Sequence, residues 1–244
     1  AARSAEPESW NRPEFLLETE ITSCELIPRG SNYTFLVELR NGSSETSLGV
    51  YKPASGERPL WDFPHGSLGA RERGAFLLSE ALGWGFVPTT VLRDGPHGPG
   101  SVQVFVPHDP RQHYFTFKDE HELQCQQICA FDWLANNADR KAGHCLRSPS
   151  ARIWGIDNGL TFHPRHKLRT VIWDYAGQPM PAAILADLQD FAGRLDRLEG
   201  DELAELAELV DPEELSALRA RLDGILQRRH FLETHEGGVP WPWL

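Results

Sequence analysis

Two short stretches of sequence decide the fold: NADRKAGH at residues 137–144 and IDNGLTF at residues 156–162. In the first stretch Asp139 and His144 stand five residues apart, and Asp157 of the second stretch follows Asp139 after eighteen residues. A carboxylate beside a reacting hydroxyl can take its proton, and a second carboxylate with one further ligand can hold a divalent cation. Each residue alone is more often a solvated loop residue, but their order and spacing together predict one catalytic centre.

Upstream, the apolar face of a helix expected over residues 67–82 carries a carboxylate, Glu72. A carboxylate on an apolar face needs a charge partner, and the nearest upstream candidate is Lys52, at the end of a strand. The alternative is an ordinary half-exposed helix glutamate. A strand lysine paired with a glutamate of the next helix holds the phosphates of ATP in kinase folds. With the two aspartates, this pair completes a set of residues typical of phosphoryl transfer.

The remaining patterns predict an α+β protein of two lobes. Residues 1–15 are polar and contain proline, which favours a loose N-terminal arm. Residues 16–107 are expected to form a small β-rich lobe with one helix, and Asn41-Gly42 indicates a two-residue hairpin turn within it. Residues 108–244 are expected to form a mostly helical lobe, with strongly helical sequence over residues 182–235.

Two further local predictions concern a turn and the tail. A glycine- and proline-rich turn is expected over residues 94–100, between two short strands of the first lobe. The tail VPWPWL at residues 239–244 is expected to pack against the body of the protein, because exposed tryptophan is costly.

Composition and charge exclude several classes of protein. The 244 residues carry 24 Lys plus Arg against 35 Asp plus Glu, a formal net charge of −11, which argues against an obligate nucleic-acid binder. A local basic site could still bind an anion. No apolar run reaches 18 residues and no secretory signal is expected. The four cysteines lack CxxC pairing, which favours free thiols and a reducing, cytoplasmic location.

Asp132 followed by Asn137-Ala138-Asp139-Arg140, together with residues 156–162, resembles the phosphatidylinositol 3-/4-kinase superfamily. The resemblance is greatest to the type II phosphatidylinositol 4-kinases, whose motifs are N-T-D-R and I-D-N-G-L-A-F. Tyr51-Lys52-Pro53 and the block at residues 58–64 also resemble a subgroup of small actinobacterial kinase-like proteins. The match covers roughly residues 20–180.

This resemblance implies a two-lobed kinase-like fold that uses ATP with Mg²⁺ or Mn²⁺. The acceptor hydroxyl would belong to a protein, the enzyme itself included, or to an inositol-type alcohol. Lys52 would contact the phosphates and Glu72 would orient it. Asp139 would be the catalytic base, with Arg140 beside it in the catalytic motif, and Asp157 would be the principal metal ligand.

The resemblance also implies a nucleotide cleft. A loop over residues 28–34 would cover the phosphates through backbone N–H groups, and residues 103–106 would form a hinge that holds adenine. Val50 and Ile156 would sandwich the ring, with Leu160 as a further candidate. The expected cleft residues are Gly30, Ser31, Asn32, Val50, Lys52, Gln103, Phe105, Val106 and Ile156.

One departure from the family pattern concerns the metal site, where His144 stands in place of the usual asparagine. An asparagine oxygen suits Mg²⁺, whereas imidazole suits Mn²⁺ or Zn²⁺ better. The second metal site is therefore expected to be weaker, to prefer Mn²⁺ or to be lost, with Asn137 as an alternative source of an oxygen. A nucleotide-binding pseudokinase that serves as an interaction module stays open, as does an enzyme that transfers AMP.

The segment after the second motif is basic. Residues 160–172 contain Arg165, Lys167 and Arg169 without an acid, which predicts an acceptor site for an anionic or phosphate-bearing substrate, the alternative being a solvated loop. No amphipathic basic helix or terminal acylation site indicates a membrane anchor, so a protein or soluble acceptor ranks above a lipid. A zinc site at Cys125 and Cys129 is weighed and set aside, because their spacing fits a helix core better.

Overall fold

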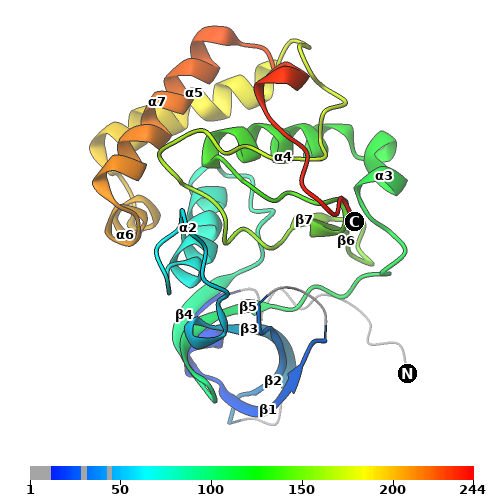
Figure 1. The fold of residues 1–244 in the computed structure, drawn as a ribbon, viewed down its shortest axis with the longest axis vertical. Helices are drawn as coiled ribbons and strands as arrows, with labels where there is room; N and C mark the ends of the chain where they lie inside the picture. Colours follow the sequence, from blue (N-terminus) through cyan, green and yellow to red (C-terminus); the bar gives the residue numbers. More distant parts are fainter. Residues whose placement is uncertain (1–11, 29–31, 43–45) are drawn as a thin grey trace.

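The computed structural model describes residues 12–28, 32–42 and 46–244 of the chain. Figure 1 shows a curved sheet at one end of the molecule and most of the helices at the other, which confirms the predicted α+β fold class. The strands are β1 (Glu20–Leu26), β2 (Phe35–Arg40), β3 (Thr46–Pro53), β4 (Thr90–Gly95), β5 (Gly98–Val104), β6 (Cys145–Arg147) and β7 (Ile153–Gly155). The helices are α1 (Pro13–Glu18), α2 (Leu68–Ala81), α3 (Tyr114–Phe117), α4 (Glu122–Ala135), α5 (Ala182–Arg197), α6 (Asp201–Leu209) and α7 (Pro212–Arg228), with short 3-10 turns at Ala54–Gly56, Lys118–Glu120, Ala142–His144 and Thr234–Glu236.

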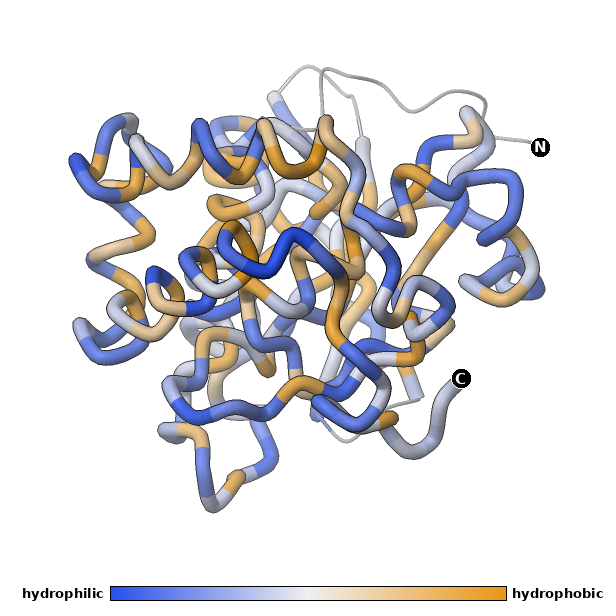
Figure 2. The backbone as a smooth tube through the Cα atoms, turned by 90° about the horizontal axis from the view of Figure 1, so that it is seen from above, coloured by the Kyte–Doolittle hydropathy of each residue, from blue (hydrophilic) through white to orange (hydrophobic). Residues whose placement is uncertain are grey.

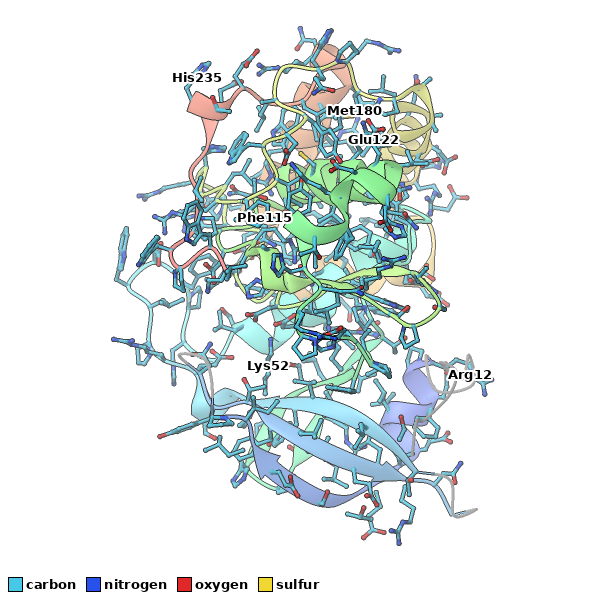
Figure 3. All side chains as sticks on the ribbon, turned by 90° about the vertical axis from the view of Figure 1, so that its right-hand side faces the viewer. Arg12, Lys52, Phe115, Glu122, Met180 and His235 are labelled. Atoms are coloured by element: carbon cyan, nitrogen blue, oxygen red, sulfur yellow. The ribbon has the colours of Figure 1, made fainter. Side chains whose placement is uncertain are left out.

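The N-terminal sheet has the strand order β1-β2-β3-β5-β4, and each pair of neighbours is antiparallel. Burial alternates along β3, so Gly49 and Tyr51 are buried while Val50 and Lys52 are only partly covered. Because successive side chains of a strand point to opposite faces, Lys52 lies on the face opposite the core of the sheet, toward the helical lobe (Figure 3). α1 supplies Leu16 to that core, beside Tyr51.

The apolar face of α2 packs in the core of the helical lobe, although α2 lies between strands of the sheet in the sequence. Phe76 of α2 belongs to the same buried cluster as Phe131 of α4. A Cβ on Gly74 would lie 3.1 Å from side-chain atoms of both Phe162 and Leu206, so glycine permits the close approach of α2 to α6. The helix that carries Glu72 is therefore fixed to the helical lobe.

A second, two-stranded sheet of β6 and β7 joins the two motifs of the sequence. Cys145 pairs with Gly155, so the hairpin starts directly after His144 and ends two residues before Asp157. The backbone N–H of Ile156 also donates to the carbonyl oxygen of His144 at 2.9 Å. Antiparallel pairing thus brings the ends of the two motifs side by side.

One turn prediction is wrong, and a second has the right place but the wrong length. The Asn41-Gly42 signal predicts a two-residue turn, but β2 and β3 pair Arg40 with Thr46, so the connection is longer, and residues 43–45 of it lie outside the described residues. A local turn signal does not fix the register when the flanking strands have packing of their own.

The glycine- and proline-rich stretch at residues 94–100 contains the predicted turn between two strands, but the turn is shorter than expected. β4 and β5 extend through it and pair Gly95 with Gly98, which leaves a short hairpin turn. A Cβ at position 95 would lie 2.6 Å from the ring of Tyr51, so glycine here makes room for a core side chain. Glycine that indicates a loop in the sequence can also mark close packing within a strand.

Both termini differ in part from the prediction. The predicted arm over residues 1–15 lies outside the described residues as far as residue 11, and its last residues belong to α1. The tail at residues 239–244 does meet the body, because the carbonyl oxygen of Trp243 accepts the N–H of Ala142 at 2.8 Å. Its rings are nevertheless exposed, Trp241 by 82 %.

Among the described residues, none of the helices combines the length and the apolar character needed to cross a bilayer. Figure 2 shows hydrophilic and hydrophobic residues alternating along the helical parts of the tube. Such alternation is typical of helices with one face in a protein core.

We predict that Gly100→Ala lowers the free energy of unfolding by about 1–3 kcal/mol, because a Cβ there collides with the backbone of β3. The added carbon would meet the carbonyl oxygen of Lys52 and would lie 2.7 Å from the Cα of Pro53. Urea unfolding measures the change. The matched control is Gly224→Ala in α7, where the described residues leave the space open and alanine should raise stability by about 0.5–1 kcal/mol. Equal changes in both variants would contradict the prediction.

Candidate active site

Lys52 joins three parts of the structure at the boundary between the sheet and the helical lobe (Figure 3). Its Nζ donates a hydrogen bond to Glu72 Oε1 on α2, and a second one to Asp157 Oδ1 at 2.8 Å. The other oxygen of Glu72 accepts the backbone N–H of Asn158 at 2.9 Å. Strand, helix and the second motif are therefore connected through one ammonium group and one carboxylate.

Lys52, Glu72 and Asp157 form a group in which opposite charges stabilise one another. Burial by itself would lower the pKa of Lys52, but Asp157 and Glu72 raise it above its ordinary value. Lys52 in turn holds the pKa of the Asp157 carboxyl well below its usual range. Both groups are charged at neutral pH, and Asp157 still exposes 48 % of its side chain.

The backbone at Asp157 adopts a left-handed conformation, with φ of 58°. Such a conformation is uncommon for residues other than glycine and persists where the surroundings enforce it. Here the flanking bonds enforce it, because the N–H of Asn158 donates to Glu72 and the carbonyl oxygen of Ile156 accepts from Arg140 Nη1 at 2.8 Å. The carboxylate is held in one direction as a result.

Asp139 lies on the loop after α4. Its N–H donates to Asn137 Oδ1 at 3.0 Å, and its Oδ2 accepts from Lys141 Nζ at 2.8 Å. Burial raises the pKa of the Asp139 carboxyl, and Lys141 opposes that rise. In the part of the chain that the structure describes, the loop thus presents a carboxylate with one oxygen bonded to a lysine and the other without a hydrogen bond.

Arg140 is fully buried and differs from its predicted role. Its Nε donates to both carboxylate oxygens of Asp132, at 3.0 and 3.1 Å, and its Nη2 donates to Asn158 Oδ1 at 2.6 Å. The motif predicts a catalytic residue, but a guanidinium with no exposed surface cannot touch a substrate. Arg140 is a positioning residue that holds the Asp157 segment against α4.

The Asn137 side chain is also used within the fold. Its Oδ1 accepts from Asp139 and its Nδ2 donates to Asp132 Oδ1 at 3.1 Å, and the residue has no exposed surface. A metal ligand must be reachable from the cleft, so the prediction of Asn137 as an alternative ligand is wrong on geometry.

His144 lies against Asp157, with 3.2 Å between Nε2 and Oδ2. Its Nδ1 accepts the N–H of Lys141 at 3.4 Å, which leaves the ring proton on Nε2. Burial lowers the pKa of His144 to about 4, so the ring is neutral at pH 7. In this state Nε2 donates to Asp157, and it could bind a cation only after its proton has moved.

A cleft of about 290 Å³ opens beside this group of residues. Among the expected cleft residues, those that line it are Asn32, Val50, Lys52, Gln103, Phe105, Val106 and Ile156, while Gly30 and Ser31 lie outside the described residues. Leu160 does not line the cleft, and its carbonyl oxygen accepts the N–H of Ala138 instead. Thr34 and Val104, which lie within the expected phosphate loop and hinge, line the cleft as well. The lining residues that sequence analysis missed are Ile27, His108 and Leu146, and no local signal marks them.

The basic segment is held in place by the end of α4 and by a largely covered ion pair. Asn136, which ends α4, donates through its Nδ2 to the carbonyl oxygens of His163 and Arg165. Lys167 pairs with Asp62 at 2.6 Å, so it is not a free cation. Arg169 is exposed, and its backbone bonds to Asn137 and Arg140, which flank Asp139.

No known family model matches the chain, but two solved structures share its architecture. The Golgi casein kinase matches 88 % of this chain and 72 % of its own, with a TM-score of 0.56 and 15 % identity. Hydra Fam20 with sugar matches 88 % of this chain and 86 % of its own, with a TM-score of 0.53 and 14 % identity. The chain therefore has an atypical kinase-like fold, and the phosphatidylinositol 3-/4-kinase type stays a prediction.

A comparison of sequences shows a relative of higher identity than these two structures. The chain is 36 % identical over 263 aligned residues to Protein Rv2133c of Mycobacterium tuberculosis (strain ATCC 25618 / H37Rv), and the match covers 93 % of each chain. The chain belongs to the same family as Protein Rv2133c.

We predict that Asp132→Asn lowers the free energy of unfolding by about 3–5 kcal/mol, because it leaves the buried Arg140 cation without its counter-charge. Side-chain shape is kept, so the loss measures the charge. Denaturant titration is the measurement, and Glu199→Gln, which breaks an exposed pair with Arg197, should cost less than about 1 kcal/mol. A loss no larger in Asp132→Asn than in this control would contradict the role of the pair.

Proposed function

We propose that this protein is an ATP-dependent phosphotransferase that phosphorylates a hydroxyl group. The observation that carries the proposal is the Lys52 ammonium, which bridges Glu72 and Asp157 at the wall of a cleft of about 290 Å³. The kinase-like fold supports it. Phosphoryl transfer needs positioning and charge neutralisation more than covalent chemistry, and these residues supply both.

The cleft suits a nucleotide in its apolar and polar parts. Val50 and Ile156 would sandwich the adenine ring. Within the described residues the backbone N–H of Val106 has no hydrogen-bond partner, so it is free to donate to the ring. Lys52 and the loop that contains Asn32 would contact the phosphates.

In the transfer step the acceptor oxygen forms a bond to the γ-phosphorus as the bond from that phosphorus to the ADP oxygen breaks. Asp139 takes the proton of the acceptor hydroxyl on its open oxygen. Lys141, bonded to the other oxygen, keeps the carboxylate oriented. Lys52 balances negative charge on the phosphates and keeps Asp157 ionised.

The residues at the phosphate end of the cleft fit a divalent cation such as Mg²⁺ or Mn²⁺. Mg²⁺ is commonly bound by one or two carboxylates together with substrate phosphates. Asp157 supplies a half-exposed carboxylate for it, and the substrate phosphates would supply further oxygens. When bound, the cation would neutralise charge on the phosphates.

The acceptor in this proposal is a protein serine or threonine, the enzyme itself included, or an inositol-type alcohol. Arg169 supports an anionic or phosphate-bearing acceptor, because its backbone lies beside the residues that flank Asp139 and its side chain is exposed. The motif resemblance favours the phosphatidylinositol 3-/4-kinase type. All four cysteines are free thiols, which favours a reducing, cytoplasmic location.

The test is incubation of the protein with γ-labelled or α-labelled ATP and either Mg²⁺ or Mn²⁺. We expect transfer of the γ label alone to the protein or to an added acceptor. Asp139→Asn should reduce transfer by about 100- to 10,000-fold, because the base is lost while the shape is kept. Asp157→Ala should abolish it, and Glu199→Gln serves as the unchanged control.

Other outcomes identify the rivals. Transfer of the α label would show an AMP-transferring enzyme in place of the kinase. A thermal shift with ATP but no transfer of either label would show a nucleotide-binding pseudokinase. If ATP with either cation gives no thermal shift, the kinase, the AMP-transferring enzyme and the nucleotide-binding pseudokinase are all refuted.

We predict that His144→Asn raises the rate with Mg²⁺ relative to the rate with Mn²⁺ by about tenfold, because it replaces an imidazole N–H with an amide that can offer an oxygen. Initial rates at matched concentrations of the two cations give the ratio. His230→Asn, an exposed histidine on the helical lobe, is the control. An unchanged ratio in His144→Asn would show that this position does not face the cation.

A further inference from the structure

A buried ion pair ties α2 to α7, far from it in sequence. Arg71 Nη2 lies 2.5 Å from Glu214 Oε1, and the two side chains are only 5 % and 7 % exposed. The other terminal nitrogen of Arg71 donates to the carbonyl oxygen of Thr161 at 2.5 Å. One guanidinium thus connects α2, α7 and the segment that follows Asp157.

Arg71 precedes Glu72, and the two side chains bind the same segment at two points. Glu72 accepts the N–H of Asn158, and Arg71 donates to Thr161 three residues further on. We infer that Arg71 and Glu214 are positioning residues that set the place of α2, and through Glu72 the place of Lys52, for phosphoryl transfer. This inference rests on the proposed function.

Two further observations show α2 held in the same position. Arg73, two residues further along α2, makes a bidentate contact with Glu205 of α6, at 2.8 and 2.6 Å. Gly74 allows Leu206 to pack directly on the helix. These contacts are all within the chain, so α2 is set in place without a partner.

Glu214 is itself fixed by the start of α7. Its Oε2 accepts the backbone N–H of Asp211 at 3.1 Å as part of a capping box, which leaves Oε1 aimed at Arg71. Neither Arg71 nor Glu214 is among the residues that line the nucleotide cleft. Loss of the pair leaves one buried charge uncompensated, and α2 must move or hydrate to relieve it. A displaced α2 would move Glu72, and with it the Lys52 ammonium that Glu72 binds.

The first test is Glu214→Gln, which keeps the shape and an oxygen for the cap while it removes the charge. We expect kcat for phosphoryl transfer to fall by about 10- to 100-fold, because small misplacements of catalytic groups have effects of this size. The dissociation constant of MgATP should change less than about threefold, since adenine contacts remain. Glu213→Gln, the exposed neighbour on α7, should leave both quantities unchanged.

A double-mutant cycle separates positioning from general loss of structure. Arg71→Gln with Glu214→Gln should be no slower than the worse single variant, because both remove one interaction. If the fall in kcat of the double variant equals the product of the falls in the two single variants, the inference is overturned. A folded Glu214→Gln protein with normal kcat would overturn it as well. If Glu214→Gln does not fold, Arg71→Lys keeps the charge but cannot bind Thr161 and Glu214 together, and it should show the same fall in kcat.

Hydrogen exchange gives a readout that needs no activity. The N–H of Asn158 donates to Glu72, so a displaced α2 should make this amide exchange faster in Glu214→Gln, with the amides of the sheet unchanged. Unchanged exchange at residues 156–162 would overturn the inference whatever the reaction is. A wild-type protein that transfers no phosphoryl group, combined with faster exchange in the variant, would refute the proposed function and retain the positioning role.

Discussion

The sharing of Lys52 between Glu72 and Asp157 is the interaction on which the rest of the structure depends. Burying an ammonium group is costly unless opposite charges and hydrogen bonds surround it. Glu72 is buried as well, and its carboxylate together with Asp157 provides the opposite charges that surround Lys52. Strand β3, helix α2 and the end of β7 must therefore meet at one point, and the packing of the two lobes satisfies this condition.

A second buried pair, Arg140 with Asp132, connects the loop that carries Asp139 to the segment that carries Asp157, as Lys52 connects the sheet to the helical lobe. Apolar residues of the same volume would often be as stable as a buried ion pair. They could not replace this one, because Arg140 also donates to the carbonyl oxygen of Ile156 and to Asn158. These bonds hold the left-handed backbone at Asp157, which no apolar contact would fix in direction.

Local pattern was enough to predict most strands of the N-terminal sheet and the main helices, and to select Lys52, Glu72, Asp139 and Asp157 as candidates whose roles stay predictions. A carboxylate on an apolar helix face and an aspartate after a buried strand are visible in a single sequence. The roles of Arg140 and Asn137 were not visible, because a motif gives the residue type but not whether its side chain faces the cleft. The Arg71–Glu214 pair spans 143 positions, and only the folded chain brings such residues together.

The place of α2 changes how the two lobes must be understood. Its apolar face belongs to the helical core, whereas the sheet has a separate core around Tyr51. The chain therefore leaves the sheet after β3, returns to it with β4 and β5, and leaves it again after β5, so it crosses the boundary between sheet and helical core more than once. Lys52 crosses that boundary, so any opening of the cleft that moves the sheet as a unit must stretch or break its bonds to Glu72 and Asp157.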